Sequence, residues 1–306
     1  MSVDLPIRAA LRPARVPADG ILEGPRVLNR GESRPYSLFS LTPLGPVIGA
    51  EINGVDLGAP LTADLRAELN RALLEWKVLF FRDQDITSAQ QRDFARNWGP
   101  LETNPFIPTG DSEQVTRFAR SAAMPGFENI WHTDVTFRPE PALGSVLRLI
   151  EVPPFGGDTM WADMAAAYDN LPEDVRARID GLTAVHDFIP GFERFSDLDF
   201  LAAHQEQFPP VEHPVVRTHP ESGRRMLFVN QAFTTHIVGL EREESDRLLR
   251  LLFQQAHVPE FQVRFRWRPN SVAFWDNRAT QHYAVNDYFP HARVAERVAI
   301  AGDRPF

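Results

Sequence analysis

Apolar residues recur at helical spacing in four parts of the chain. Thr62 stands where an N-cap is expected, because Leu65, Leu69 and Leu73 follow it at spacings that place them on one helix face. Three further segments combine an apolar stripe with a start or stop signal. They run from the Thr87/Gln90 capping box to Gly99-Pro100, over residues 163–179 with a break near Pro172, and over residues 242–256.

Short runs rich in β-branched and aromatic residues indicate strands between and after these helices. They cover residues 46–52, 78–81, 131–137, 271–275, 281–285 and 293–300. Strands occur on both sides of the helical segments, and no internal repeat is present. The pattern therefore predicts a mixed α+β protein.

Length and composition agree with one folded domain. The chain has 306 residues with 43% hydrophobic content, enough for a sizeable core. Residues 1–35 are rich in Pro, Arg and Gly without periodicity, so we expect a flexible or edge-docking N-terminal extension before one domain over residues 36–306. No run approaches 18 apolar residues and no secretory signal is recognisable, which favours a cytoplasmic protein without a membrane partner.

Charge and cysteine content narrow the function classes. The sequence has no cysteine, which excludes disulfides, thiolate metal sites and cysteine nucleophiles. The net charge is −9 and the basic residues do not cluster, which argues against nucleic acid or an anionic membrane as a main partner. Individual arginines could still bind a small anion.

Candidate metal ligands come from two parts of the chain. His132 and Asp134 are two positions apart in a predicted strand, so both side chains would project from one face. Two other His-x-acid steps, at His204 and His219, lie in segments expected to be surface loops. His282 lies on a later predicted strand, and two imidazoles with one carboxylate can occupy one face of an Fe(II) ion. The alternative for the first pair is a polar pair in a loop.

Two arginines follow in the last predicted strand. Arg293, Ala295 and Arg297 would share one face of a strand otherwise rich in Val and Ala. Guanidinium groups on such a face are costly unless they meet anions. The pattern indicates an anion site beside the metal, and the alternative is an exposed edge strand whose charges oppose aggregation.

Four segments together resemble the taurine dioxygenase family. Its members are Fe(II)- and 2-oxoglutarate-dependent dioxygenases, among them alkylsulfatases and phenoxyacetate-degrading enzymes. The similarity extends from about Leu44 to the C-terminus, with the segments in the family's order and at similar spacing. The segments are 131–137 (WHTDVTF), 156–161 (GGDTMW), 213–220 (HPVVRTHP) and 275–282 (WDNRATQH).

Both the strand pattern and the resemblance imply a double-stranded β-helix, a cupin-like variant of the jelly roll, with flanking helices. The long interval between the metal-ligand strands would be an insertion with a lid over much of residues 185–212. Its phenylalanines either line the substrate pocket or pack under a loop; they are Phe188, Phe192, Phe195, Phe200 and Phe208.

The resemblance also assigns residue roles. It makes the two histidines and the aspartate the iron ligands, with 2-oxoglutarate and dioxygen as co-substrates. Thr159 and Arg293 match the positions that hold the distal carboxylate of 2-oxoglutarate, and Arg297 the position that meets an anionic group of the prime substrate. Asn104, where the taurine-cleaving member has a His, and Glu128, in a segment near the taurine amine of that enzyme, are further candidates for substrate binding.

The expected partner is a small anionic organic substrate, and a homo-oligomer is left open. Because Asp134 is kept, whereas related halogenases lack this carboxylate, hydroxylation is favoured. An organosulfonate or alkyl sulfate would then be cleaved. The alternatives are a hydroxylase or desaturase of a carboxylated metabolite, including phenoxyacetate-like compounds, and, from other classes, a Zn(II)-dependent hydrolase or a non-catalytic metal-binding scaffold. A hydrolase would leave Arg293 and Thr159 without a role.

The other histidines show no convergent pattern in the sequence. We expect them to be hydrogen-bonded or surface residues without a metal. They are His186, His204, His213, His219, His236, His257 and His291.

Overall fold

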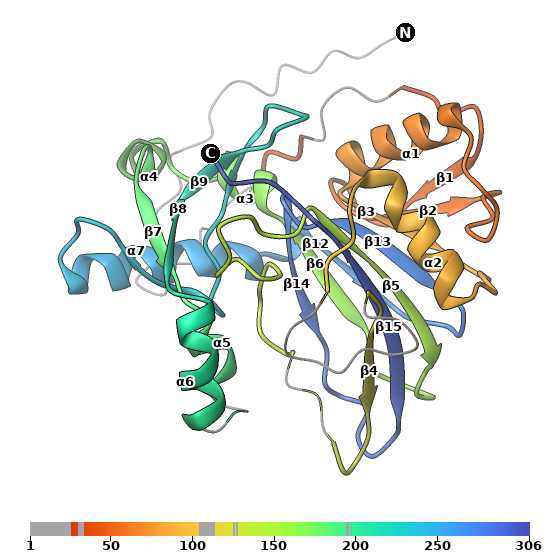
Figure 1. Ribbon diagram of the computed structural model, residues 1–306. Helices are drawn as coiled ribbons and strands as arrows, with labels where there is room; N and C mark the ends of the chain where they lie inside the picture. Colours follow the sequence, from red (N-terminus) through yellow and green to blue (C-terminus); the bar gives the residue numbers. More distant parts are fainter. Residues whose placement is uncertain are drawn as a thin grey trace, which may run out of the picture.

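Two sheets that pack face to face form the centre of the protein (Figure 1). The computed structural model describes residues 26–29, 34–103, 114–124, 126, 128–193, 196 and 198–306. Asn104, Phe195 and most of the N-terminal extension therefore lie outside the described residues. The chain has a mixed α/β architecture with one large sheet.

The large sheet has seven strands in the order β1-β2-β3-β13-β5-β15-β4. Neighbours are antiparallel except β2 and β3, which run parallel. The strands are β1 Ser40–Pro43, β2 Ala50–Asn53, β3 Val78–Phe81, β4 Thr116–Arg120, β5 Gly144–Glu151, β13 Val272–Asp276 and β15 Arg293–Ile300.

Alternation along the strands gives the large sheet two buried faces. In β3, Leu79 and Phe81 belong to a core beneath the helices α1 (Ala63–Trp76) and α2 (Ser88–Ala95), which is followed by a 3-10 turn over Arg96–Trp98. Val78 and Phe80 project to the opposite face and belong to the other core. The predicted run 78–81 is thus a strand buried on both sides.

The second sheet covers that opposite face. Its three antiparallel strands lie in the order β12 (Gln262–Phe265), β6 (Thr159–Asp163) and β14 (Thr280–Ala284). Phe80 of the large sheet stacks on Phe265 with ring centroids 3.9 Å apart, and Trp275 packs at 5.8 Å from Trp161. Around these rings, the space between the sheets is therefore filled by apolar side chains.

The interval between β6 and β12 forms the other side of the protein in Figure 1. A three-stranded sheet in the order β11-β7-β8 and the hairpin of β9 and β10 lie here with most of the helices. The elements are α3 Met164–Asp169, α4 Glu173–Ile179, β7 Thr183–His186, α5 Ile189–Phe192, α6 Leu198–Gln207, β8 Val211–Pro214, β9 Val216–Thr218, β10 Arg225–Leu227, β11 Thr234–Ile237, α7 Arg242–Gln254 and two 3-10 turns, Gln255–His257 and Pro259–Phe261.

The helix signals in the sequence are confirmed. The Thr62 hydroxyl accepts a hydrogen bond from the Leu65 N–H at 3.2 Å, and Thr87 with Gln90 forms the complete capping box. The segment 163–179 divides into α3 and α4 on either side of Pro172, as predicted. These signals act within one turn of the chain, so distant residues do not override them.

Three local predictions were wrong. Residues 131–137 are not a strand, because Val135 takes a left-handed conformation (φ 51°) and the chain turns at Asp134. His204 lies in α6 and not in a loop. The strand predicted over 46–52 starts only at Ala50, because Gly49 (φ 82°) bends the chain first.

The described phenylalanines of the insertion do not line a pocket at the predicted metal site. Four of them form a separate cluster with Phe137 and Phe233, with Phe137 at ring-centroid distances of 5.1–6.2 Å from Phe188, Phe192, Phe208 and Phe233. Of the two roles predicted for these phenylalanines, hydrophobic packing is therefore confirmed.

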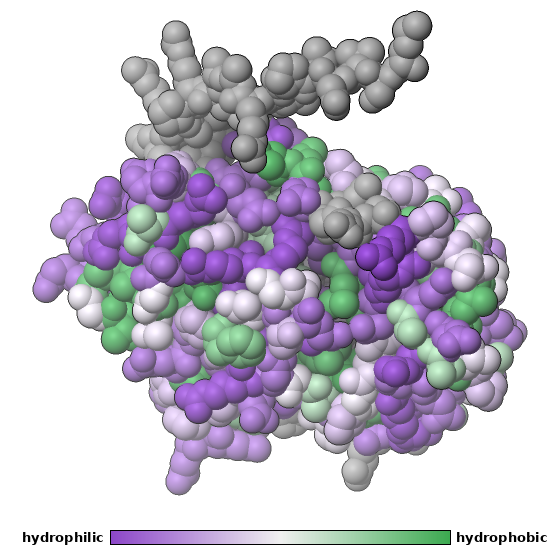
Figure 2. Space-filling view, turned by 90° about the horizontal axis from the view of Figure 1, so that it is seen from above, coloured by the Kyte–Doolittle hydropathy of each residue, from purple (hydrophilic) through white to green (hydrophobic). Residues whose placement is uncertain are grey.

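The outer surface is mixed in character. In Figure 2 polar residues cover most of the face that is seen, and apolar residues appear in separate patches. Among the described residues, no helix combines the length and the apolar character that crossing a membrane would need. Part of the N-terminal extension touches the domain: the Val27 backbone exchanges two hydrogen bonds with the Asn170 side chain, at 2.7 and 2.9 Å.

Candidate active site

A turn and a strand end bring the three predicted metal ligands together. His132 forms an isolated bridge with His282 of β14, with backbone hydrogen bonds of 3.1 and 2.8 Å. Asn277 then holds the next bend, since its side chain accepts from the Asp134 N–H at 3.0 Å and donates to the Asp134 carbonyl at 3.1 Å. The convergence predicted from a strand is thus produced by a turn that a distant asparagine fixes.

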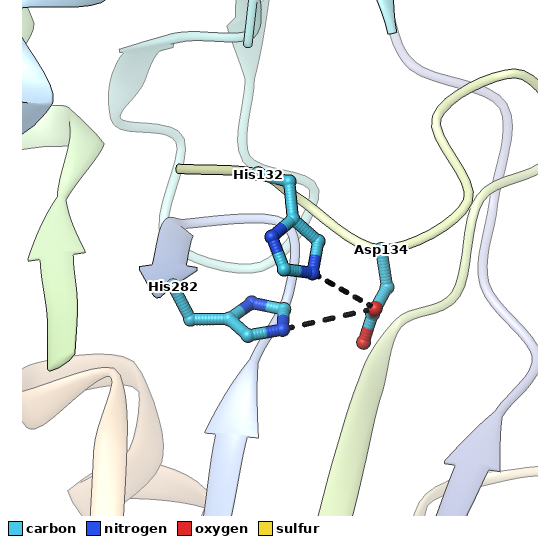
Figure 3. A group of neighbouring side chains, drawn as sticks. All are labelled: His132, Asp134 and His282. Atoms are coloured by element: carbon cyan, nitrogen blue, oxygen red, sulfur yellow. Dashed lines mark ion pairs between the residues drawn. The ribbon is translucent and has the colours of Figure 1, made fainter. Parts of the chain in front are cut away.

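The three side chains point toward one another (Figure 3). One candidate ligand atom from each residue lies within 4.8 Å of the others, and both Nε2 atoms are 3.7 Å from Asp134 Oδ1. His132 Nδ1 lies 2.8 Å from the Ile130 carbonyl and donates to it, which fixes the ring with Nε2 toward the other two side chains. Two nitrogens and one carboxylate in this arrangement fit a divalent iron ion.

The protonation states also suit metal binding. Burial and the neighbouring His132 lower the pKa of His282 to about 3. Burial alone would raise the pKa of Asp134, but the charges of Arg297 and of the two histidines lower it to about 2. At neutral pH the imidazole of His282 is neutral and the carboxylate is ionised, which are the forms that bind metals.

A cavity between the two sheets joins this cluster to the predicted anion site. Arg293, Ala295 and Arg297 share one strand face, as predicted, and all three line the cavity. The second sheet contributes Thr159 and His282. The other lining residues are Phe118, Arg120, Gly126, Glu128, His132, Leu147, Trp275, Ala284, Val285, Asn286 and Tyr288.

The two arginines have different partners. Arg293 is buried, and it donates from Nε to the Gly157 carbonyl at 3.1 Å and from Nη2 to the Thr159 hydroxyl at 3.4 Å. Arg297 donates from Nη1 to both oxygens of Asp134, at 2.8 Å each. Arg293 therefore meets neutral acceptors, and Arg297 meets a carboxylate of the candidate metal cluster.

The remaining candidate for substrate binding lies at the Arg293 end of the cavity. Glu128 forms an ion pair with Arg120. Both charges act on the pKa of Arg293, which Glu128 raises and Arg120 lowers, while burial lowers it most. Arg120 is the neighbour of Arg293 across the β4–β15 ladder. The sequence did not identify Arg120, because only strand pairing brings β4 next to β15.

Segment 213–219 holds both ligand-bearing parts of the chain. His213 Nε2 lies 2.9 Å from the carbonyls of Thr136 and Arg138, just after Asp134. His219 accepts from backbone N–H groups at Nδ1 and lies 3.0 Å through Nε2 from Asp276, six positions before His282. The expectation that these histidines are hydrogen-bonded residues is confirmed. The prediction that His219 lies in a surface loop is wrong, because its side chain is buried and bonded to Asp276.

Comparison with known proteins agrees with this geometry. Residues 40–299 match the family model described as "Taurine catabolism dioxygenase TauD, TfdA family". The chain is 40% identical over 282 residues to an alpha-ketoglutarate-dependent sulfate ester dioxygenase of Pseudomonas putida, covering 89% of this chain and 92% of the relative. It is 36% identical over 282 residues to an alkylsulfatase of Acinetobacter baylyi, covering 88% and 87%.

Two further matches extend the comparison. An alpha-ketoglutarate-dependent 2,4-dichlorophenoxyacetate dioxygenase of Cupriavidus pinatubonensis is 36% identical over 259 residues, which cover 78% of this chain and 90% of the relative. Among solved structures, a taurine dioxygenase from Burkholderia xenovorans superimposes with a TM-score of 0.77 at 40% identity, covering 88% of this chain and 91% of that chain.

Fold, site and relatives together define a non-heme iron dioxygenase that uses Fe(II), 2-oxoglutarate and dioxygen. More narrowly, the chain belongs to the TauD/TfdA family.

Proposed function

We propose that this enzyme hydroxylates a small alkyl sulfate or organosulfonate at the carbon that bears the sulfur group. The hydroxylated product then collapses to a carbonyl compound and releases sulfate or sulfite. One observation carries the proposal: one cavity is lined by His132 and His282 of the candidate metal cluster and also by two arginines with different partners. Such a site has separate cations for a co-substrate and for an anionic substrate.

His132, Asp134 and His282 hold the iron in this proposal. When bound, Fe(II) supplies the oxidising chemistry together with 2-oxoglutarate and dioxygen. Thr159 and Arg293 bind the distal carboxylate of 2-oxoglutarate, because a guanidinium and a hydroxyl donor on one wall match the acceptors of a carboxylate. The residues of the chain thus supply position and charge.

Arg297 binds the anionic group of the prime substrate. It uses Nη1 for Asp134, and its Nε is buried without a hydrogen-bond partner among the described residues. A guanidinium has five N–H donors, so an anion can bind while the contact with Asp134 persists. Asn104, which the structure does not describe, and Glu128 remain further candidates for substrate contacts.

The cavity walls support charge recognition. Phe118, Leu147, Trp275 and Ala295 line it with apolar surface. Apolar walls exclude water and strengthen attraction between a bound anion and the arginines. They also leave room for the hydrocarbon part of a small substrate.

For the fold, we propose that the two packed sheets form a double-stranded β-helix, the cupin-like variant of the jelly roll, within one domain over residues 36–306. The interval between Asp134 and His282 is an insertion on this core, with its lid over much of residues 185–212. A cytoplasmic location, a possible homo-oligomer and the absence of a nucleic-acid partner stay predictions from the sequence.

A carboxylated substrate is the second candidate. Arg297 would bind a carboxylate as well as a sulfate, and the relative from Cupriavidus pinatubonensis is named for 2,4-dichlorophenoxyacetate. A zinc hydrolase or a metal-binding scaffold is not favoured, because neither gives Thr159 and Arg293 a role.

The test is an anaerobic titration of the Fe(II) protein with 2-oxoglutarate, followed by single additions of an alkyl sulfate, an organosulfonate and a phenoxyacetate. We expect a visible charge-transfer band with 2-oxoglutarate, which shifts with a sulfur compound. Admission of dioxygen should then release succinate with sulfate or sulfite. Release of a phenol alone would favour the second candidate, and no band in folded, iron-loaded protein would contradict the proposed function.

A further inference from the structure

The hydroxyl of Thr159 is surrounded by donors. Thr159 begins β6 and is 3% exposed. Trp267, two residues beyond β12, donates its indole N–H to the Thr159 hydroxyl at 3.0 Å, and Arg293 donates from Nη2 at 3.4 Å. Among the described residues, the Thr159 hydroxyl donates no hydrogen bond of its own.

The chemistry of these groups fixes the direction of the Thr159 proton. A hydroxyl has one donor and two acceptor sites, whereas an indole and a guanidinium can only donate. Both acceptor sites of Thr159 are therefore occupied, and its O–H cannot point at either neighbour. Thr159 lines the cavity beside Arg293, so an acceptor bound in the cavity is available to the O–H.

We propose that Trp267 is a positioning residue that orients the Thr159 hydroxyl as a hydrogen-bond donor to the distal carboxylate of 2-oxoglutarate. The inference rests on the proposed function of Thr159 and Arg293. Trp267 acts without touching the co-substrate, since it does not line the cavity. Its N–H makes the hydroxyl selective for an acceptor such as a carboxylate.

Packing holds the indole in place for this task. Trp267 is 3% exposed and meets Phe265 edge to face, with ring centroids 5.0 Å apart at 89°. Trp161 lies on another side, at 6.4 Å. A phenyl ring at position 267 would keep much of this packing and remove the N–H.

The test measures the Kd of 2-oxoglutarate by anaerobic titration of the charge-transfer band. Trp267→Phe should raise the Kd about fivefold, the size expected for one hydrogen bond. Thr159→Val should raise it as well, but adding Trp267→Phe to Thr159→Val should change it less than about twofold, because the indole then has no hydroxyl to orient. Steady-state kcat at saturating 2-oxoglutarate should change less than KM.

The matched control is Trp98→Phe. It removes an indole hydrogen bond of the same 3.0 Å length, to Asn70 on the far side of the large sheet, and should leave the Kd within about twofold of wild type. If Trp267→Phe does not fold, benzothienylalanine at position 267, which carries sulfur in place of the N–H, provides the same comparison.

Two results would overturn the inference. One is an unchanged Kd of 2-oxoglutarate in Trp267→Phe. The other is an equal rise in Kd when Trp267→Phe is made in the wild type and in Thr159→Val, because Trp267 would then act through packing alone. Either would leave the proposed function standing. Failure of the wild-type protein to bind 2-oxoglutarate would instead contradict the proposed function itself.

Discussion

Arg293 and Arg297 are four positions apart on one strand face, but their guanidinium groups meet different hydrogen-bond acceptors. Arg293 is held by a carbonyl and a hydroxyl, and burial lowers its pKa. Arg297 is held by the carboxylate of Asp134. A buried cation that meets only neutral acceptors gains most from an incoming anion, which is why Arg293 suits a tightly bound co-substrate.

Substitution of each arginine should affect the binding of one compound only, 2-oxoglutarate for Arg293 and the prime substrate for Arg297. Arg293→Ala should raise the KM for 2-oxoglutarate at least about tenfold, because a charge-assisted hydrogen-bond pair is lost. Arg297→Ala should raise the KM for the prime substrate and leave 2-oxoglutarate binding within about threefold of wild type. Steady-state kinetics with each compound varied in turn measures both. Equal losses for both compounds in either variant would indicate a structural role instead.

Removal of one candidate ligand should abolish iron-dependent turnover. His132→Ala leaves one imidazole and one carboxylate, which hold a divalent ion weakly. The measurement is iron content after desalting, together with succinate release. His236→Ala, at an exposed position of β11, is the control and should retain both the iron content and the succinate release of the wild type. Full activity in His132→Ala would remove this residue from the metal site.

At the scale of elements, segment 213–219 connects parts of the chain that carry the candidate ligands. Neither His213 nor His219 reaches the cluster itself, but they bond the turn after Asp134 and the residue that ends β13. Asp276 also accepts from Arg278, and these neighbours hold its pKa well below its ordinary value although burial opposes this. Short sequence motifs far from the metal can thus set ligand geometry.

His213→Leu should weaken Fe(II) binding about 10-fold, the low end of what loss of an outer partner costs, because His213 bonds the turn after Asp134 and not Asp134 itself. His213→Gln keeps a donor and should recover part of the affinity. Competition with a chromophoric chelator measures the Kd, and circular dichroism checks that the variants fold. Wild-type affinity in His213→Leu would show that the turn holds its shape without this contact.

At the scale of the whole molecule, the candidate site lies where the two packed sheets and the 183–237 region meet. The large sheet supplies both arginines, the second sheet supplies Thr159 and His282, and the histidines behind the Asp134 turn come from the third sheet. His186 and His213 lie with ring centroids 5.1 Å apart, and burial lowers the pKa of both, strongly so for His186.

These two histidines should make stability depend on pH. Their folded pKa values lie below the ordinary value of 6.5, so below pH 6.5 the unfolded chain binds protons that the folded chain does not. Stability is therefore full above pH 6.5 and falls as the pH decreases, by at most about 1.4 kcal/mol per pH unit for each histidine. Urea unfolding between pH 7.5 and 5.5 measures the slope.

His186→Gln should reduce that slope even if it lowers stability at every pH. Asn230→Ala is the matched control, because Asn230 donates to the same Thr136 hydroxyl at 2.9 Å but does not titrate. It should destabilise the protein without changing the slope. An unchanged slope in His186→Gln would contradict the assignment of this pH dependence to His186.

Features that depend on neighbours within a few residues could be predicted from the sequence. The Thr62 and Thr87 caps, the buried run 78–81 and the shared face of Arg293 and Arg297 follow from local hydrogen bonding and from strand alternation. The motif segments also predicted His132, Asp134 and His282 as metal ligands, and their side chains converge in the structure.

Features that depend on distant partners could not be predicted, because the folded chain alone brings those partners together. The turn at Asp134 is fixed by Asn277, 143 positions away, which overrides the strand pattern of residues 131–137. The Trp267 contact with Thr159 spans 108 positions, and His213 reaches Thr136 over 77. Patterns along a chain record which face a residue presents, but not which residue from another sheet meets it there.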